Sequence, residues 1–252
     1  MTEQIKILFL SANPKDISRI RLDEEVREVD QKIRMGEFRD QLTLIPHFAV
    51  RPGDLQETLL RHQPHVLHFS GHGSATQGIV LEDNQGRTKL VSSAALAALF
   101  SAIRDNLRIV LLNACYSSLQ AEVITQTVDF TIGMRKEIGD RSAIVFSAAF
   151  YRGLAFGRSV QESFDLGVGA LMLEGIPEEQ TPALLPRKGV DASHAYLILP
   201  QTDRPRTAEQ VLPHLPPSGS HGAVNLTGTH INSGQDTVIT GQSNTTHNHG
   251  GK

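Results

Sequence analysis

The sequence of 252 residues lacks the features of several classes of protein. Its single cysteine, Cys115, excludes an intramolecular disulfide and any multi-cysteine metal site. No apolar run approaches the roughly 18 residues of a membrane span, and the N-terminal run is too short for a signal peptide. The net charge is −3 and the basic residues are scattered, which is unlike a nucleic-acid-binding protein. We therefore expect no membrane or nucleic-acid partner, and a cytoplasmic location, where a lone thiol stays reduced.

Charge is scarcest near the C-terminus. Residues 207–251 contain no Lys or Arg, and only Glu209 and Asp236 are acidic. Residues 201–222 are rich in Pro and predict a linker. Residues 223–252 are rich in Gly, Asn, Thr and Ser, with too few apolar residues for a core, and predict a flexible, low-complexity tail.

The tail has two further interpretations. Segment 224–249 has no Pro, very little charge and many Asn, Gln and Thr, which are features of segments that stack as cross-β. Its histidines also allow metal binding by His247 and His249, with His221 and His230. The metal interpretation is the weaker one because nothing fixes the geometry of these side chains.

Residues 1–200 alternate apolar strands with amphipathic helices. Strands are predicted at 5–10, 41–48, 66–70, 108–113, 128–133 and 195–199, with a hairpin at 78–90. Helices are predicted at 17–35, 52–60, 92–103 and 159–173, the last opened by a capping box. Segment 142–156 is compatible with a buried helix or a strand, and its length and alanines favour a helix. This alternation predicts a three-layer α/β fold around a mostly parallel sheet.

Two of these strands end in reactive side chains. "HFSGHG" places His72 just after one strand, and "LLNACYSS" places Cys115 just after another. In such sheets the functional groups gather beyond the carboxyl ends of the strands. A thiol is a useful nucleophile as a thiolate, and a nearby imidazole accepts its proton. Gly71 and Gly73 let the backbone approach a substrate, and the N–H groups of Gly73 and Cys115 are candidate donors to an oxyanion.

Each of these residues has a blander explanation by itself. A lone Cys is more often a buried small hydrophobe and a lone His is more often structural, but the pair at adjacent strand ends is a candidate site. His65, His68 and His72 also raise the idea of a metal site. No Asp or Glu ligands cluster with them in the sequence, so we expect no metal and no cofactor.

The pairing of "HFSGHG" with "LLNACYSS" resembles the caspase/separase/gingipain class of cysteine peptidases, in its CHAT-domain branch. The flanking stretches "ILFLSANPKDISRIRLDEEVREV" and "VDFTIGMRKEIGDRSAIVFSAAFYRGLAFGRSVQESFDLG" extend the resemblance over about residues 4–200. It implies that residues 1–200 form a caspase-like three-layer α/β sandwich with a His/Cys dyad. His72 would be the general base and acid, Cys115 the nucleophile, and the backbone amides of Gly73 and Cys115 the oxyanion hole.

The resemblance also points to the residues that bind substrate. In many members of the class, an acidic or amide residue two positions before the cysteine lines the primary specificity pocket, and here that residue is Asn113. Asn lacks the charge of an Asp that would pair with a basic side chain, so Asn113 assigns no Arg or Lys specificity. Asn13 is a second candidate for the border of the pocket, or else a turn residue before Pro14.

The function implied is a cysteine endopeptidase with a protein substrate, acting as a regulated effector in prokaryotic (antiviral) defence or cell-death signalling. The tail resembles bacterial amyloid-signalling motifs, which implies activation by a nucleotide-binding receptor or by self-assembly through residues 224–249. The alternative is a non-catalytic scaffold that assembles through the tail. A TIR-like or flavodoxin-like nucleotide-binding domain is disfavoured because no phosphate-binding glycine loop follows the first strand.

Overall fold

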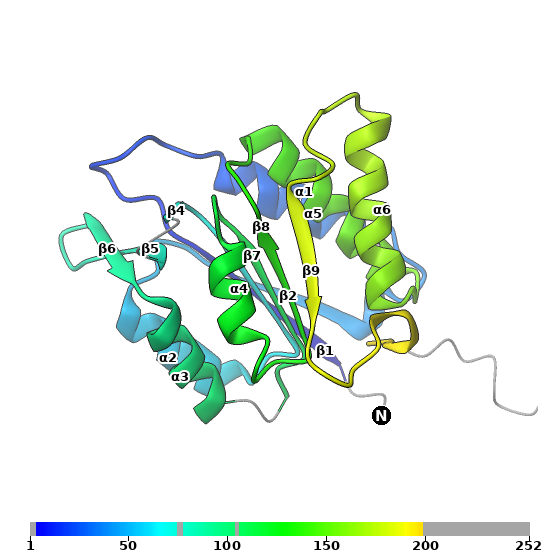
Figure 1. The fold of residues 1–252 in the computed structure, drawn as a ribbon, viewed down its shortest axis with the longest axis horizontal. Helices are drawn as coiled ribbons and strands as arrows, with labels where there is room; N and C mark the ends of the chain where they lie inside the picture. Colours follow the sequence, from blue (N-terminus) through cyan, green and yellow to red (C-terminus); the bar gives the residue numbers. More distant parts are fainter. Residues whose placement is uncertain (1–3, 75–77, 104–105, 199–252) are drawn as a thin grey trace, which may run out of the picture. The chain divides into compact units, whose positions relative to one another are not determined.

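A six-stranded sheet runs through the protein, whose computed structural model describes residues 4–74, 78–103 and 106–198 (Figure 1). The strand order is β2-β1-β3-β7-β8-β9. The strands are β1 (Ile5–Ser11), β2 (Leu42–His47), β3 (Val66–Ser70), β7 (Ile109–Asn113), β8 (Phe130–Met134) and β9 (Pro182–Pro186). All neighbouring strands are parallel except β9, which pairs antiparallel with β8. The expected mostly parallel sheet is therefore confirmed.

Helices cover both faces of the sheet (Figure 1). One face carries α1 (Leu22–Arg34), α5 (Asp140–Ala155) and α6 (Val160–Leu173). The other carries α2 (Pro52–His62), α3 (Ser93–Ala102) and α4 (Ser118–Ile124). Short 3-10 helices lie at η1 (Arg39–Gln41) and η2 (Ala192–His194).

The central strands are apolar throughout because each of their faces meets a helical layer. Along β1, Ile7 and Phe9 enter the core with α1, α5 and α6, whereas Leu8 and Leu10 enter the core on the opposite face. The period of two that separates these sets is the ordinary alternation of a strand. The result is the predicted three-layer sandwich with two cores.

A second, smaller sheet lies beside the carboxyl end of β3. It consists of β4 (Gly73–Ser74), β5 (Gly78–Glu82) and β6 (Thr88–Val91), all antiparallel. Strands β5 and β6 form the predicted hairpin, and Asp83 closes its turn by accepting hydrogen bonds from the backbone of Gln85 and Arg87. Strand β4 follows His72 directly, so this sheet is attached to the candidate site.

Local sequence signals placed most elements correctly. Ser92 caps α3, and Ser159 and Glu162 form the predicted capping box of α6. Helix α1 begins at Leu22 rather than at residue 17, and α4 and β9 were not predicted.

The strand predicted at 195–199 is wrong for its described residues, 195–198, which follow η2 without forming a strand. There Ala195 bonds to the start of α6 instead, through its carbonyl and the N–H of Val160. No helix among residues 4–74, 78–103 and 106–198 is long and apolar enough to cross a membrane. The predicted linker and tail, 201–252, lie outside the described residues.

Candidate active site

His72 and Cys115 follow neighbouring strands at equal distances. In the register of β3 and β7, Ser70 is opposite Asn113, and each candidate residue lies two positions beyond its strand's last residue. The N–H of Gly71 still bonds to the carbonyl of Asn113, which continues the ladder past the strand ends. The parallel register therefore brings the two reactive side chains to the same edge of the sheet, as the sequence predicted.

Both side chains line one cavity of about 220 Å³. Its other lining residues come from the loop before α1, from α1 itself, from the ends of β3 and β7, from the loop before α5 and from α5: Ser18, Arg19, Ile20, Arg21, Glu25, Ser70, Gly71, Asn113, Ile138, Asp140, Ala143 and Ile144. A larger hollow of about 450 Å³ lies between α1, α5 and α6, but neither His72 nor Cys115 lines it. The smaller cavity is therefore the one of these two that contains the candidate dyad.

Gly73 holds the two loops together by lacking a side chain. A Cβ at Gly73 would lie 2.3 Å from the carbonyl oxygen of Cys115 and 3.1 Å from the Cβ of Ala114. The backbone of Cys115 therefore occupies the space beside Gly73, where the sequence led us to expect a substrate. A bond from Val80 N–H to the His72 carbonyl makes Gly73 and Ile79 a non-hydrogen-bonded pair, so the N–H of Gly73 points away from β5.

The imidazole of His72 is oriented by a backbone carbonyl. Its Nε2 lies 2.7 Å from the carbonyl oxygen of Ser18. A carbonyl only accepts hydrogen bonds, so Nε2 carries the proton in this contact, and in the neutral ring Nδ1 carries the lone pair. The sequence analysis did not identify Ser18, since a backbone acceptor leaves no signature in residue type.

Asn13 secures the loop that carries Ser18 rather than the shared cavity. Its side chain donates to the carbonyl of Ile20 (2.9 Å) and accepts from the N–H of Ile20 (3.3 Å). Asp16 in the same loop accepts two bonds from Thr88 of the hairpin, at 2.8 and 3.1 Å. Asn13 lines a neighbouring cavity and is absent from the described lining of the one that His72 and Cys115 share.

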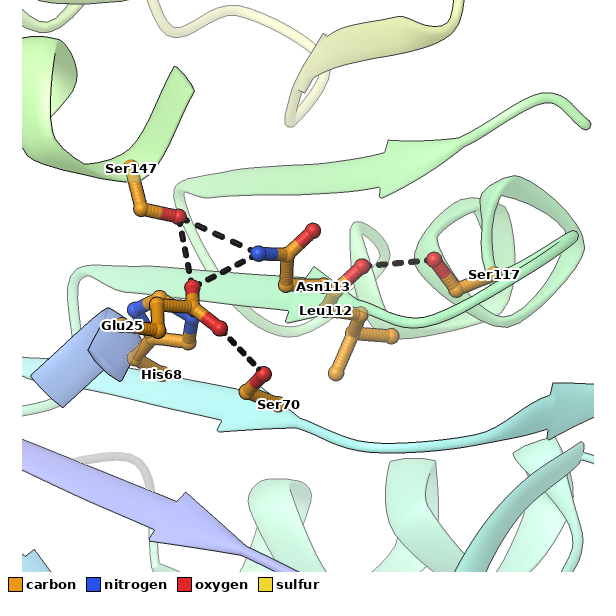
Figure 2. A network of polar contacts seen from close by, with 7 residues as sticks. All are labelled: Glu25, His68, Ser70, Leu112, Asn113, Ser117 and Ser147. Carbon is orange, nitrogen blue, oxygen red and sulfur yellow. Dashed lines mark hydrogen bonds and ion pairs between the residues drawn. The ribbon is translucent and has the colours of Figure 1, made fainter. Parts of the chain in front are cut away.

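Tyr116 turns the chain sharply after Cys115. Its φ of 59° lies in the left-handed region, which costs a non-glycine residue about 1 kcal/mol. The next residue, Ser117, is fully buried, and its hydroxyl donates to the carbonyl of Leu112 at 2.6 Å (Figure 2). The same hydroxyl accepts from the N–H of Met134 at 2.9 Å. Cys115 therefore lies at a bend of the chain that the hydrogen bonds of Ser117 hold in place.

A buried carboxylate that was not predicted adjoins the cavity (Figure 2). Glu25 of α1 accepts hydrogen bonds from Asn113 Nδ2 (2.7 Å) and Ser147 Oγ (2.8 Å) at Oε1, and from Ser70 Oγ at Oε2. His68 Nε2 lies 3.1 Å from Oε1. One carboxylate therefore joins α1, β3, β7 and α5 beside the candidate dyad.

His68 lies against Glu25 without a well-directed hydrogen bond, although Nε2 and Oε1 are 3.1 Å apart. Among the described residues neither ring nitrogen of His68 has a hydrogen-bond partner of good geometry. Burial by itself raises the pKa of Glu25, but the attraction to His68 and the hydrogen bonds from Ser70 and Asn113 outweigh it. The pKa of Glu25 is therefore below its usual value, and the buried carboxylate is ionised at neutral pH.

Asn113 lies where the family pattern expects a specificity residue. It is only 3% exposed, it lines the cavity, and its Nδ2 is used by Glu25 and Ser147. Its Oδ1 has no hydrogen-bond partner within the described part of the chain. The side chain of Asn113 thus offers its Oδ1 as an acceptor, while its Nδ2 is hydrogen-bonded to the Glu25 carboxylate.

A signal for Glu25 did exist in the sequence. The buried face of α1 consists of Leu22, Glu25, Val29 and Ile33, so an acid replaces an apolar residue on the core-facing stripe. Such a residue needs buried partners. On an amphipathic helix such as the one predicted at 17–35, a Glu is ordinarily a solvated charge, so Glu25 did not stand out from its neighbours.

The other histidines near the strand have structural contacts. His68 is fully buried between Phe9 and Tyr151, with ring centroids 4.2 and 5.7 Å away. His65 Nδ1 accepts the backbone N–H of Lys6 at 3.1 Å. No group of three His, Cys, Asp or Glu that could hold a metal ion was found among the residues described.

Comparison with known proteins identifies the family. A family model of the CHAT domain matches residues 10–165. A "Probable protease" of Gillisia limnaea is 26% identical over 153 residues, 60% of this chain and 27% of that protein. A "Roc-COR-CHAT protease" of an unknown prokaryotic organism is 22% identical over 187 residues, 71% of this chain and 18% of that protein. The chain therefore spans less than a third of the length of either relative.

Solved structures show the same fold. The Arg-specific cysteine proteinase gingipain R superposes with a TM-score of 0.53 at 12% identity, covering 76% of this chain and 47% of that one. Caspase-1 from Spodoptera frugiperda gives a TM-score of 0.50 at 9% identity, covering 74% of this chain and 87% of that one. At these identities the likeness shows the fold, which is caspase-like.

Proposed function

The chain belongs to the CHAT-domain family, and on that premise we propose that it is a cysteine endopeptidase with His72 and Cys115 as its dyad. The observation that carries the proposal is the shared cavity, which both His72 and Cys115 line just beyond the ends of two paired parallel strands. The protease names of two relatives support the same class of reaction.

The mechanism follows from the side chains in the cavity. Nδ1 of His72 accepts the proton of the Cys115 thiol while Ser18 holds Nε2, and the thiolate sulfur attacks the peptide carbonyl carbon. The N–H groups of Gly73 and Cys115 stabilise the oxyanion. The intermediate collapses with cleavage of the C–N bond, and His72 returns its proton to the departing amine. Water then hydrolyses the thioester, with His72 again acting as the base, and regenerates the thiol.

The enzyme is proposed to act as a regulated cytoplasmic effector in prokaryotic defence or cell death. Residues 1–200 would form the peptidase domain, 201–222 a linker and 223–252 the segment through which a nucleotide-binding receptor or self-assembly brings copies together. We expect low basal activity, because an unregulated endopeptidase is toxic.

The test is cleavage of a diverse peptide library by the purified full chain, alone and after induced clustering. Cys115→Ala and His72→Ala should abolish cleavage. His194→Ala is the matched control, since His194 is 83% exposed, pairs with Asp191 and is outside the described lining of the cavity. Cleavage that survives both dyad substitutions would exclude the dyad. No cleavage by the wild type under any condition would favour the non-catalytic scaffold.

A further inference from the structure

The helical layer formed by α1, α5 and α6 contains an apolar groove. Helix α5 packs against α1 and also against α6 (Figure 1). The hollow of about 450 Å³ between the three helices has a floor of small and aliphatic side chains: Ile144, Val145, Ala148, Ala149 and Ala170. Charged side chains form its rim, together with Leu173, which is 89% exposed. We name this hollow the α1–α5 groove.

The α1–α5 groove has the length of a short helix. On α1 it is lined by one stripe of side chains from Arg21 to Lys32, and on α5 by a stripe from Arg141 to Arg152. Steps of three and four residues keep each stripe on one side of its helix. Each stripe spans about 16 Å, or three helical turns. The alanines of the floor leave room for a further helix, whose axis would pack at roughly 8–10 Å from its neighbours.

Helices α1 and α5 run in the same direction along the groove. Where they begin, the backbone N–H of Arg21 donates to the carboxylate of Asp140, and beyond their ends Phe38 donates to the carbonyl of Ala155. The groove therefore has an end at which both helices begin and an end at which both finish. Only the first of these ends adjoins the cavity of the candidate dyad, with which it shares Arg21 and Ile144.

The charges are balanced where the two helices begin. Arg21 pairs with Glu24 at 2.8 Å, and Arg141 pairs with Glu174 at the same distance. All four side chains line the groove. This end therefore attracts neither an acidic nor a basic partner strongly.

Positive charge is in excess where the two helices finish. There the groove lies between Lys32 of α1 and Arg152 of α5. Arg152 is exposed and makes no ion pair within the described part of the chain. Lys32 has Glu28 at 4.0 Å, and Glu28 also lies 3.9 Å from Arg27. Charge complementarity therefore favours a partner with acidic side chains at this end.

Helix electrostatics indicate the direction of such a partner. Acidic side chains stabilise a helix most in its first turn, beside the positive end of its dipole. The C-terminal ends of α1 and α5 have the opposite partial charge. A helix that runs antiparallel to both therefore places its first turn, with its acidic residues, between Lys32 and Arg152.

The remaining part of this chain is poorly suited to supply that helix. Residues 207–251 contain only two acidic residues, Glu209 and Asp236. Residues 223–252 are rich in Gly, Asn, Thr and Ser, which are weak helix formers, and have few apolar residues. An occupant with an apolar face and an acidic first turn therefore comes from another protein.

We propose that the α1–α5 groove is the docking site for one amphipathic α-helix of a partner protein. The helix lies antiparallel to α1 and α5, with large apolar side chains such as Leu against Ala148 and Ala149. Acidic residues in its first turn pair with Lys32 and Arg152.

The experiment measures binding of a designed probe to the full chain by fluorescence anisotropy. The probe is a lactam-stapled helix of about 14 residues with Leu along one face and two Glu in its first turn, since an unstapled helix of this length is marginal in water. One comparison peptide has the same composition with its Leu residues spread around the helix, and should bind at least about 10-fold more weakly. Another has the two Glu in its last turn, and should bind about 3- to 10-fold more weakly.

Variants of the protein locate the binding site. Arg152→Glu should weaken binding of the acidic probe by about 5- to 10-fold and strengthen binding of a probe with Lys in place of Glu. Ala149→Leu fills the floor and should weaken both probes by about 5-fold. Arg27→Glu is the matched control, because Arg27 is 80% exposed on α1 and outside the described lining of the groove.

Every readout is binding, so the result is independent of the proposed peptidase activity. Equal binding of the peptides, or binding that Arg152→Glu leaves unchanged, would overturn the proposal. Binding of a peptide of residues 223–252 that Arg152→Glu weakens would assign the groove to the chain's own tail instead. A dimer in sedimentation that Arg152→Glu dissociates would assign it to a second copy. Should Ala149→Leu fail to fold, the exposed Arg152 remains the deciding position.

Discussion

Replacement of Gly73 by Ala tests whether the contact between the two site loops is needed for catalysis. The added Cβ would lie 2.3 Å from the Cys115 carbonyl oxygen, 3.2 Å from its nitrogen and 3.1 Å from the Cβ of Ala114. Ordinary contact begins near 3.4 Å, so the loops must separate by about 1 Å. The nearest atom belongs to the backbone of Cys115, and the Cβ of Ala114 cannot move by a side-chain rotation, so no change of rotamer relieves the clash.

The magnitude follows from this displacement. A shift of about 1 Å between a nucleophile and its base is expected to lower kcat/KM by about 100-fold. Overpacking of this kind costs about 1–3 kcal/mol of stability, so the variant should remain folded but unfold at a lower temperature. The φ of Gly73 is outside the left-handed region, so the effect is steric rather than conformational.

Peptide cleavage and thermal unfolding of Gly73→Ala should be measured beside Gly169→Ala. In the interior of α6 no described atom lies within 4 Å of a Cβ built at Gly169, so alanine there should stabilise the protein by about 0.5–1 kcal/mol without changing the cleavage rate. A Gly73→Ala variant with wild-type turnover would refute the reasoning, because the loops would then tolerate separation.

Two further predictions concern the loop before α1 and the ends of β7, β8 and β9. Asp16→Ala removes the carboxylate that accepts hydrogen bonds from Thr88, and so loosens the loop whose Ser18 carbonyl holds His72. The rate of peptide cleavage should fall by about 3- to 10-fold with little change in Tm. An unchanged rate would show that other contacts hold the loop. Asp129 accepts hydrogen bonds from Arg187 and Arg108; burial raises its pKa, but these partners outweigh it, so the pKa is lowered. Ionised Asp129 therefore stabilises the folded protein at pH values above the ordinary pKa of 3.8. This stabilisation is lost as the pH falls through the lowered pKa of Asp129 in the folded state. Asp129→Asn should lower the free energy of unfolding by about 1–2 kcal/mol at pH 7, and the difference from wild type should shrink below pH 4 in urea titrations; a difference independent of pH would contradict an ionic origin.

Much of the fold was predictable because its signals are local. The apolar run of β3 and the capping box of Ser159 and Glu162 mark their elements within a few residues. Strand β9 escaped prediction because Pro182 and Pro186 at its ends resemble loop residues, although prolines are tolerated at an edge strand. The short helix α4 offered little periodicity in its seven residues.

The positions of the two candidate dyad residues were predictable from the sequence for a similar reason. A His and a Cys placed directly after apolar strands need only a parallel sheet to meet at one edge, and alternating strands and helices predict such a sheet. His72 and Cys115 do line one cavity. Whether they act as a dyad stays a prediction until the cleavage assay is done.

The sequence by itself thus determined the sheet, its covering helices and which strand ends hold the thiol and the imidazole, because strand period, helix caps and turns act over a few residues. Only the tertiary structure decided that Ser18 orients His72, that Gly73 makes room for Cys115, and that Glu25 joins α1 to β3, β7 and α5 beside the cavity. Glu25 is 45, 88 and 122 positions from its partners Ser70, Asn113 and Ser147. Such contacts depend on how helices cross the sheet, and that packing is not encoded in any short stretch of the chain.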